Sequence, residues 1–369
     1  MVSSGGKDKR MKAYLFGAKS IAIGVSRALR DLDKDFIQEG FLVSSLEGNP
    51  EEIDGIPVVE LASAAEKLGS REKREIPVYL AVPEDIHQVV TGILENYGFA
   101  NCVPVTAERE ARWMERYYER LGLFPSVHHL TKGSTTPEVS VFAARFAKDR
   151  KLENPPQFPD YVHSILLGCS AHSSGEQQAE ADFLDNTGEH ISEKNPNYCE
   201  MTAFYWIWKN ALEKAGDYVG VYHYRRALDL SKKDLQRMAE HGVDAVLPYP
   251  MIHLPDMREH HTRYIKETDW QAMLAALKEL YPDYARAYPR LSRSIYFYNY
   301  NLILAKKKVF SDYCGWVFPL LSRVEELSVP RGWERGDRYT AYMSESLLTL
   351  YILYHRELKI YHTGRILYT

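Results

Sequence analysis

Residues 185–226 read DNTGEHISEKNPNYCEMTAFYWIWKNALEKAGDYVGVYHYRR, and the fold expected for the rest of the chain follows from this stretch. Asn195 and Pro196 have the residue types of a helix N-cap and a first helical position. Apolar side chains then recur at helical spacing up to the Ala-Gly pair at 215–216. Residues 218–222 form a short apolar run that is typical of a buried strand. The stretch therefore predicts a polar loop, one helix and one buried strand.

This strand runs directly into His223, Arg225 and Arg226. Open α/β sheets bind ligands beyond the carboxyl ends of their strands. The guanidinium fork matches a phosphate, and the expected helix N-terminus beside Lys194 attracts anions. We therefore predict a diphosphate site here, with His223 orienting the ligand. In the alternative interpretation, the arginines pair with surface carboxylates and His223 is a satisfied core histidine.

Length and composition narrow the class of protein. A chain of 369 residues with 45% hydrophobic and 26% charged residues is typical of a two-domain globular protein. The net charge of −4 and the absence of a long basic run argue against a nucleic-acid-binding protein. The four cysteines form no CxxC pair, which fits a reducing cytoplasm and argues against a disulfide framework or a zinc site.

The N-terminal residues are polar and basic, and they lack the apolar segment of a signal peptide. Residues 1–10 give no helix or strand pattern. No run of about 18 apolar residues is present to span a membrane. We expect a cytoplasmic protein, for which peripheral contact with the inner membrane stays open.

Strands alternate with helices over residues 11–125, which predicts a small Rossmann-like α/β domain with a parallel sheet. The turn after its first strand keeps Gly17 and Gly24 but has Lys19 and Ala22 where a dinucleotide fingerprint needs glycine. NAD binding is therefore not expected. The loops around residues 46–58 resemble those in the N-terminal domains of sialic acid and bacillosamine acetyltransferases. Residues 126–137 have the composition of a linker.

Residues 138–369 are expected to form a second α/β domain. Predicted strands cover 139–144, 162–167, 218–222, 244–247, 296–305 and 358–361, and predicted helices cover 196–215, 268–280, 282–290, 307–326 and 341–354. Residues 249–263 are expected to form a loop rich in Tyr, His and Arg.

This second domain resembles the capsular-polysaccharide glycosyltransferases that were long described as a domain of unknown function. The resemblance rests on Asp185-Asn186-x-Gly188, Ile191-Ser192-x-Lys194-Asn195-Pro196, Tyr198-Cys199-Glu200, Tyr205 to Asn210, Tyr218-Val219-Gly220-x-x-His223-Tyr224-Arg225-Arg226, Asp244 to Pro248, Tyr300-Asn301, Tyr313-Cys314-x-Trp316, and Arg338 followed by Glu345. It implies a GT-A-like fold and transfer of a sugar from a nucleotide donor during surface-glycan assembly. Because some members are associated with galactofuranose transfer, UDP-galactofuranose is one expected donor. The family often has a histidine after the first strand, whereas residues 143–148 have none.

GT-A enzymes usually hold a divalent metal with Asp-x-Asp at a strand end, and no such motif follows a predicted strand here. Asp31-Leu32-Asp33 has the letters but lies in a predicted helix of the first domain. We expect Arg225, Arg226 and Lys194 to stabilise the leaving diphosphate in place of a metal. The alternative is a divalent metal held by other residues.

Glu345 lies in the most apolar predicted helix, where burial disfavours the charged carboxylate and makes it a candidate catalytic base. In an inverting transfer this base takes the proton of the acceptor hydroxyl. The alternative is that Glu345 pairs with Arg338, seven residues earlier. Asp337 is the second candidate base.

The remaining candidate residues are polar groups near the expected donor. We assign donor binding to Asp185, Asn195, Glu200, Asn299, Asn301 and Arg338. Asn299 and Asn301 alternate along a predicted strand and would share one face. Glu200 would orient His223 or Arg225, or bind donor hydroxyls. His260 and Arg263 belong to the expected loop, which we interpret as a lid or acceptor surface.

The sequence thus predicts an inverting glycosyltransferase that uses a UDP-sugar and a lipid-linked or oligosaccharide acceptor. One alternative is an NAD(P)-dependent sugar-nucleotide oxidoreductase that uses the N-terminal domain. Another is a non-catalytic sugar-nucleotide-binding protein of a capsule locus.

Overall fold

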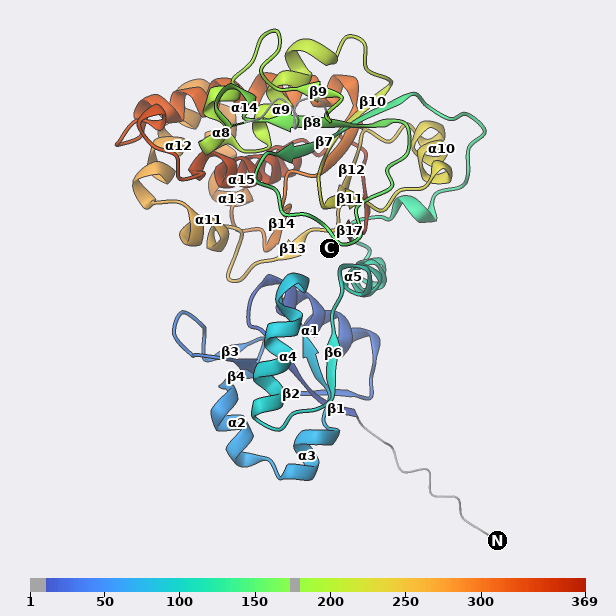
Figure 1. Cartoon of the computed structure of the whole chain (residues 1–369), viewed down its shortest axis with the longest axis vertical. Coiled ribbons are helices and arrows are strands. Elements are labelled where there is room, and N and C mark those ends of the chain that lie inside the picture. Colours follow the sequence, from blue (N-terminus) through green and yellow to red (C-terminus); the bar gives the residue numbers. More distant parts are fainter. Residues whose placement is uncertain (1–10, 173–179) are drawn as a thin grey trace. The chain divides into compact units, whose positions relative to one another are not determined.

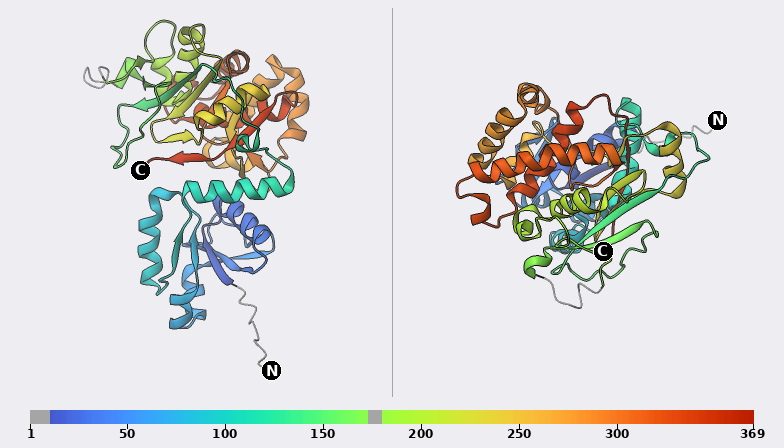
Figure 2. Two further views of the ribbon diagram at one scale, coloured as in Figure 1. Left: turned by 90° about the vertical axis from the view of Figure 1, so that its right-hand side faces the viewer. Right: turned by 90° about the horizontal axis from the view of Figure 1, so that it is seen from above.

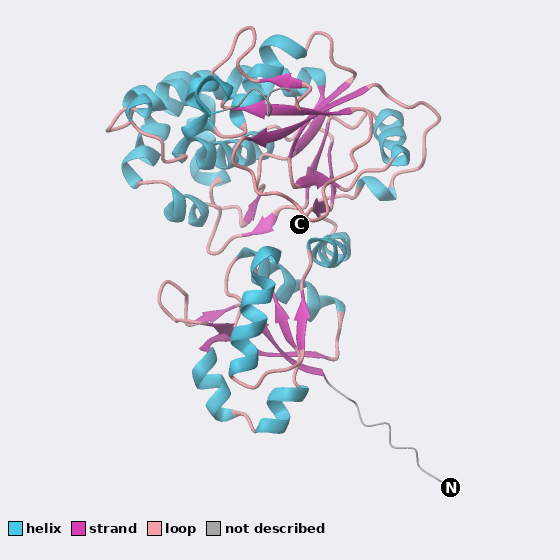
Figure 3. Ribbon diagram, in the orientation of Figure 1, coloured by secondary structure: helices cyan, strands magenta, loops and turns pink. Residues whose placement is uncertain are grey.

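The computed structural model of the chain describes residues 11–172 and 180–369. It divides into two compact units, with the boundary between Leu123 and Phe124. Each unit has its own sheet and its own apolar core (Figures 1 and 3). Residues 1–10, which show no helix or strand pattern, lie outside the described part. None of the described helices combines the length and hydropathy needed to cross a bilayer.

The first unit is a six-stranded α/β sheet with the strand order β3-β4-β2-β1-β5-β6. All neighbours are parallel except β3 and β4. Its strands are β1 (Met11–Phe16), β2 (Phe36–Val43), β3 (Glu52–Ile53), β4 (Ile56–Glu60), β5 (Val78–Leu80) and β6 (Cys102–Pro104). Its helices are α1 (Ser20–Leu32), α2 (Leu61–Lys67), α3 (Ser70–Glu75), the short η1 (Glu84–Ile86), α4 (His87–Asn96) and α5 (Ala107–Leu121). This order is that of half a doubly wound nucleotide-binding sheet.

The backbone of the turn between β1 and α1 explains why Gly17, one glycine of the dinucleotide fingerprint, is present in this chain. Gly17 has φ +115°, and a Cβ there would lie 2.7 Å from the carbonyl oxygen of Ala81. Only glycine fits such a turn. Lys19 precedes α1, and its Nζ donates to the carbonyl oxygen of Gly48 at 2.7 Å.

The second unit is built on a mixed sheet with the order β16-β12-β15-β10-β7-β8-β9, extended from β10 by β11 and β17. Its strands are β7 (Val139–Phe146), β8 (Val162–Leu167), β9 (Phe183–Leu184), β10 (Tyr218–His223), β11 (Arg226–Leu228), β12 (Ala245–Pro248), β15 (Ile303–Lys306), β16 (Ile360–Thr363) and β17 (Arg365–Leu367), with a separate pair β13 (Met251–Ile252) and β14 (Tyr296–Phe297). Strand β10 lies at the centre because residues 218–222 are apolar on both faces, as the sequence predicted.

Helices cover both faces of this sheet. The larger group is α9 (Met201–Trp206), α11 (Arg258–Tyr264), α12 (Glu267–Leu280), α13 (Pro282–Leu291), α14 (Lys307–Leu327) and α15 (Tyr339–Tyr354). Shorter segments are η2 (Val127–His129), α6 (Cys169–His172), η3 (Ser192–Lys194), α8 (Asn195–Tyr198), the π-helical turn η4 (Ile207–Ala211) and η5 (Gly332–Glu334), and the remaining helix is α10 (Lys232–His241). The orange and red helices α12 to α15 gather on one side of the unit, and yellow α10 lies on the other (Figures 1 and 2). The segment 126–137 belongs to this unit and buries Val127.

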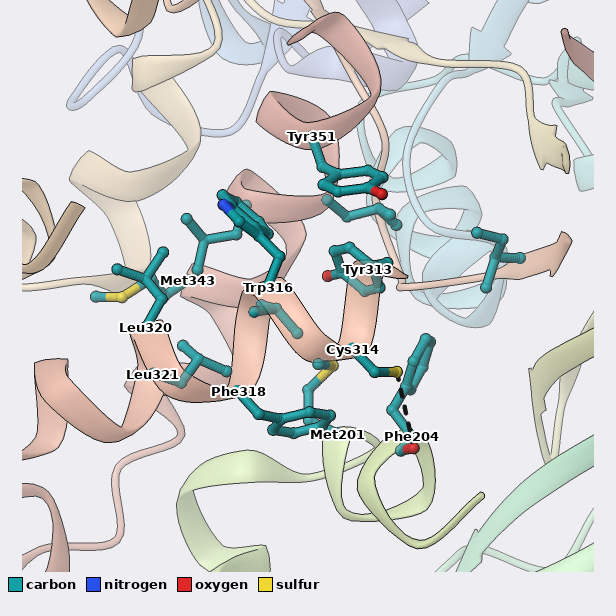
Figure 4. Close-up of a cluster of buried hydrophobic side chains, with 14 of the residues drawn as sticks. Met201, Phe204, Tyr313, Cys314, Trp316, Phe318, Leu320, Leu321, Met343 and Tyr351 are labelled. Carbon is teal, nitrogen blue, oxygen red and sulfur yellow. Dashed lines mark hydrogen bonds between the residues drawn. The ribbon is translucent and has the colours of Figure 1, made fainter. Parts of the chain in front are cut away.

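The main core of the second unit lies between the sheet and the α12–α15 group (Figure 4). Phe204 of α9 stacks on Phe310 of α14, with ring centroids 5.4 Å apart. The Sγ atom of Cys314 lies 3.9 Å from the carbonyl oxygen of Phe204. Met343 of α15 is fully buried in the same cluster. This packing fixes α9, α14 and α15 against each other and so fixes the polar residues at their ends.

Three elements of the second unit differ from the sequence prediction. The helix expected over 196–215 is broken at Cys199, whose φ of 45° and ψ of −123° are incompatible with a helix. The strand expected over 296–305 is two strands, because Tyr300 and Asn301 have φ of 76° and 49°. The loop expected over 249–263 contains β13 and α11, where the histidine side chains are buried by tertiary contacts that the local pattern does not contain.

Candidate active site

The strand order of the second unit reverses at β7. The chain passes from β7 to β8 and β9 on one side, and returns to pair β10 with the other side of β7. The two strands are parallel, with His223 of β10 beside Ala144 of β7. Ligands of open α/β sheets bind at the carboxyl ends of the strands at such a reversal. The residues that follow β7 and β10 therefore flank the candidate site.

A pocket of about 530 Å³ lies at this edge of the sheet. Its lining includes Arg145 and Phe146 at the end of β7, Lys151 in the following loop, Phe158, and Tyr224 just after β10. Cationic side chains suit phosphate, and aromatic rings suit a flat base. The volume and the lining are those of a small-ligand pocket.

Asp149 connects this pocket with the arginines predicted from sequence. Its Oδ2 accepts the backbone N–H of Phe146 at 2.7 Å. Burial raises the pKa of Asp149 to about 6, against the opposing effects of that hydrogen bond and of the Arg145 and Arg225 charges. Arg225 directly follows Tyr224, which lines the pocket, so its backbone lies beside the pocket wall.

Two carboxylates meet on the neighbouring side of the site. Asn301 Nδ2 donates to Glu200 Oε1 at 2.7 Å and to Ser344 Oγ at 2.9 Å. Glu345 accepts the backbone N–H of Tyr300 at 2.9 Å on Oε1, and its Oε2 lies 2.9 Å from His260 Nε2. The sequence predicted Glu345 and Glu200 as site residues but did not predict that they lie together.

Burial raises the pKa of Glu200 to about 7, and the negative charge of Glu345 adds to the rise. The hydrogen bond from Asn301 and the charge of Arg338 act in the opposite direction. A carboxyl group with a pKa near neutrality can accept a proton from a hydroxyl group and release it again at physiological pH.

Tyr300 connects the carboxylates with the end of β10. Its backbone N–H holds Glu345, and its backbone also makes a hydrogen bond with His223. The guanidinium groups of Arg226 and Arg365 lie 4.6 Å and 5.4 Å from the centre of its ring. The arginines of the predicted diphosphate site and the two carboxylates thus border one region.

His223 lies between these groups as a neutral side chain. Burial, followed by the charge of Arg226, lowers the pKa of His223 to about 3. Its Nε2 is buried and has no hydrogen-bond partner within residues 11–172 and 180–369. A buried ring nitrogen without a partner is costly unless a ligand completes it.

Backbone strain gathers at the same place. Cys199, Tyr300, Asn301 and Arg338 are non-glycine residues with φ of 45°, 76°, 49° and 66°. Arg338 Nε donates to Cys199 Sγ at 3.2 Å, which joins two of these strained residues. Such conformations cost about 1–3 kcal/mol each and concentrate at functional sites.

The structure places Asp185 in the framework of the unit. It is fully buried and accepts hydrogen bonds from the backbone N–H groups of Gly168 and Cys169 and from the hydroxyls of Ser192 and Thr202. With four donors from its own chain, this carboxylate fixes the loop after β8. The structure gives Asp185 a structural role, and the donor-binding role predicted for it stays a prediction.

Lys194 and Asn195 are likewise held by other residues of the chain. Lys194 Nζ lies 2.6 Å from the buried Glu325 Oε2, which also accepts the Tyr198 hydroxyl at 2.9 Å. The Asn195 side chain donates to the carbonyl oxygen of Cys199 at 3.0 Å and does not cap a helix. Glu325 therefore pairs with the charge that the sequence assigned to the diphosphate, and a diphosphate contact of Lys194 stays a prediction.

The other predicted residues divide between the site and its surroundings. Arg338 interacts electrostatically with Glu200 and His223, whereas the alternative from sequence paired it with Glu345, whose oxygens contact Tyr300 and His260. His260 is buried against Glu345, so it belongs to the interior of the site and not to a mobile lid. Arg263 forms an ion pair with Glu259 one turn earlier. Asn299 has a buried Oδ1 without a partner in the described part of the chain.

Sequence reasoning missed Tyr300, Asp149 and the pairing of His260 with Glu345. Tyr300 was noted as part of an alternating strand and of the family resemblance, and its left-handed backbone cannot be read from either pattern. Asp149 lies three residues beyond the β7 run, where a polar residue after a strand was an available signal.

The described ranges contain no group of three or more His, Cys, Asp or Glu side chains arranged to hold a metal ion. The Asp31-Leu32-Asp33 letters lie on α1 and at its C-terminal end in the first unit.

The family model described as domain of unknown function DUF4422 matches residues 153–356, more than half of the 369 residues. The chain belongs to this family. The match covers β10, both carboxylates and Arg225, and it begins after β7 and Asp149. No curated protein shows significant sequence similarity to the chain.

Among solved structures, the apo structure of the bifunctional glycosyltransferase WbbM is similar, with 25% identity and a TM-score of 0.52. The match covers 62% of this chain and 45% of that one, so it spans less than half of WbbM. This similarity, together with the mixed sheet, gives the chain a GT-A-like α/β fold in a glycosyltransferase-like family. A Rex-family repressor (15% identity, TM-score 0.24, 31% of this chain and 62% of that one) and an engineered D-amino acid dehydrogenase bound to NADP+ (14%, 0.20, 31% and 34%) match too weakly to support an argument.

Proposed function

We propose that the second unit transfers a sugar from a nucleotide donor, a UDP-sugar such as UDP-galactofuranose or another UDP-hexose, to a surface-glycan acceptor with inversion at the anomeric carbon. The observation that carries this proposal is the position of Tyr300, with arginines over its ring and Glu345 on its backbone N–H. A nucleotide pocket and a pair of carboxylates then flank the place where the anomeric carbon would lie. Membership of the family and the similarity to WbbM support the same reaction class.

The donor would bind at the carboxyl ends of β7 and β10. Its base and ribose would occupy the pocket between Phe146 and Tyr224. Its diphosphate would face Arg225 and Arg226, whose positive charges stabilise the charge that develops on the leaving group. His223 Nε2, which has no hydrogen-bond partner among the described residues, would form a hydrogen bond with the donor. Lys194 pairs with Glu325, and its contact with the diphosphate stays a prediction.

Glu200 is the base in this proposal, and Glu345 is its neighbour. In the transfer, Glu200 takes the proton of the acceptor hydroxyl, the acceptor oxygen bonds to the anomeric carbon, and the bond from that carbon to the phosphate oxygen breaks. Glu345 was the sequence expectation, but both of its oxygens are already held by Tyr300 and His260. Burial raises the pKa of Glu200 to about 7, and the charge of Glu345 adds to this rise and so helps to prepare the base.

The acceptor would be an oligosaccharide or a lipid-linked glycan, reached from the cytoplasmic side of the inner membrane. This assignment rests on the family resemblance of the sequence.

Glu200→Gln should lower kcat by about 10²–10⁴. Glu345→Gln should lower it less and shift the pH profile to lower pH, because the neighbouring charge is gone. Turnover with a panel of UDP-hexoses and alkyl glycoside acceptors, followed by NMR of the product anomer, measures both effects. Full turnover in Glu200→Gln, or a product that retains the donor configuration, would contradict the mechanism.

Arg225→Ala and Arg226→Ala should each abolish most turnover while the far-UV spectrum stays unchanged, because they remove charge from the leaving-group side. The matched control is Arg323→Ala, an arginine of α14 whose partners Glu279 and Glu326 are half exposed. Equal turnover in all three variants would sink the arginine assignment.

A further inference from the structure

The face of α15 that carries Glu345 continues outward as an aromatic surface. Tyr342 and Glu345 are three residues apart and share one side of the helix, and Arg338 is the N-cap residue that precedes it. The Arg338 guanidinium lies 5.6 Å from the centre of the Tyr342 ring. The Glu345 carboxylate is therefore one helical turn away from the Tyr342 ring, above which the Arg338 guanidinium lies.

Tyr264, the last residue of α11, extends this surface to solvent. Its ring is stacked on that of Tyr342, with centroids 4.6 Å apart and planes at 13°. The side chain is 45% exposed, whereas Tyr342 is half-buried beneath it. A stacked pair with an open outer ring is a flat apolar surface at the border of the site.

The pair is also joined to the carboxylates through His260. Its ring centroid is 5.1 Å from that of Tyr264, and its Nε2 lies 2.9 Å from Glu345 Oε2. His260 is 2% exposed, and its Nδ1 has no hydrogen-bond partner among the described residues. The aromatic pair is thus fixed by the same histidine that holds a carboxylate of the site.

We propose that Tyr264 and Tyr342 form the acceptor subsite, in which the ring of the acceptor sugar stacks on the exposed face of Tyr264. A sugar ring has one face of C–H groups, which suits an aromatic plane, and hydroxyls at its edge, which suit charged groups. Stacked there, its edge would face Arg338 on one side and the carboxylates on the other. A nucleobase is the competing ligand for a tyrosine, but the donor pocket with its own aromatic residues lies at the end of β7. This inference rests on the proposed transferase function.

The test measures binding of acceptor and donor separately on the full chain. The probes are UDP, followed by calorimetry, and a panel of octyl glycosides (galactoside, glucoside and N-acetylglucosaminide) with UDP present, followed by saturation-transfer NMR. Tyr264→Ala should weaken the best octyl glycoside by about ten-fold. Tyr264→Phe, which keeps the ring, should bind it as the wild type does. UDP affinity should be the same in all three proteins.

The matched control is Tyr97→Ala, which removes a tyrosine of similar exposure, 41%, from the first unit. Two results would overturn the acceptor subsite alone, provided that the wild type binds UDP. In the first, Tyr264→Ala binds the glycoside as tightly as the wild type does. In the second, the wild type binds no glycoside of the panel, and in both cases the transferase proposal stands. A loss of UDP affinity in Tyr264→Ala would assign the ring to the donor and also overturn the inference. Failure of the wild type to bind any uridine nucleotide would remove the transferase proposal itself.

Discussion

Glu200 is the residue whose ionisation should influence both stability and turnover. Its pKa is raised from 4.5 to about 7 in the folded protein, with burial as the main cause. The folded state therefore holds this proton at pH values where the unfolded chain has released it. The stabilising effect is complete below about pH 4.5 and is lost as pH rises through about 7.

We predict that wild-type stability falls relative to Glu200→Gln between pH 5 and pH 8. The upper bound of the change is about 3 kcal/mol, because each pKa unit corresponds to about 1.4 kcal/mol. Urea unfolding of both proteins at a series of pH values measures the difference, and all other titrating groups cancel in it. If the unfolding free energies of the wild type and Glu200→Gln change with pH in parallel, Glu200 is not desolvated in the folded state.

Cys199 allows the backbone strain of the site to be measured. Its φ of 45° and ψ of −123° lie in a region that glycine adopts readily and other residues do not. Both Cys199→Gly and Cys199→Ala lose the contact of Sγ with Arg338, but only glycine relieves the strain. We expect Cys199→Gly to be more stable than Cys199→Ala by about 1 kcal/mol in urea unfolding. The reverse order would mean that the backbone at this position relaxes at little cost.

At the scale of elements, a buried ion pair braces the segment that leads into α15. Arg335 donates to both oxygens of Asp269 on α12, at 2.9 Å and 2.6 Å, and the two side chains are 7% and 0% exposed. The same guanidinium lies 4.1 Å from the ring of Tyr339. These contacts fix the start of the helix that carries Arg338, Tyr342 and Glu345.

Asp269→Ala should lower the unfolding free energy by about 3–5 kcal/mol, because it leaves a buried guanidinium without its main counter-charge. Arg323→Ala, which breaks exposed pairs on α14, should cost less than about 1 kcal/mol. Chemical denaturation of the two variants compares them directly. If both variants lose the same small amount, the pair is solvated and does not brace the segment.

The elements also show which part of the structure the sequence could predict. Strand β10 and helices α12 to α14 were predicted because their apolar residues follow the pattern of a buried strand or an amphipathic helix, and α15 because it is apolar nearly all round. The break at Cys199 and the turn at Tyr300 and Asn301 were not predicted. None of these three residues is glycine, so their left-handed conformations come from tertiary contacts such as those of Asn301 with Glu200 and Ser344. Pattern reasoning therefore fails at the strained residues that form the site.

On the scale of the whole molecule, the α/β class and the GT-A-like fold followed from strand–helix alternation and family resemblance. The arrangement of the site did not, because it joins residues more than 100 positions apart, such as Glu200 and Asn301. The ion pair of Lys194 could not be predicted from local sequence either, since its partner Glu325 lies 131 residues away. The position of the residues at the end of β10 could be predicted from sequence. The carboxyl end of a strand in an open α/β sheet lies at the edge where ligands bind, whatever the tertiary contacts are.

The first unit has the strand order of a nucleotide-binding sheet but keeps Lys19 and Ala22 in place of fingerprint glycines. The oxidoreductase alternative requires this unit to bind NAD(P)H, which calorimetry would detect. Nothing in the geometry of the described residues of the second unit favours the oxidoreductase alternative.

The most direct test of the central claim is thermal unfolding of the full chain with UDP or a UDP-sugar, in EDTA or in Mn²⁺. At about 100 times its dissociation constant, a ligand of the folded state stabilises by about 2.7 kcal/mol, which is readily detected. We predict a rise in Tm that survives EDTA and is absent in Arg225→Ala, as expected if arginines hold the diphosphate. A rise that requires Mn²⁺ would contradict the arginine-based site, and a rise with NAD(H) alone would contradict the transferase.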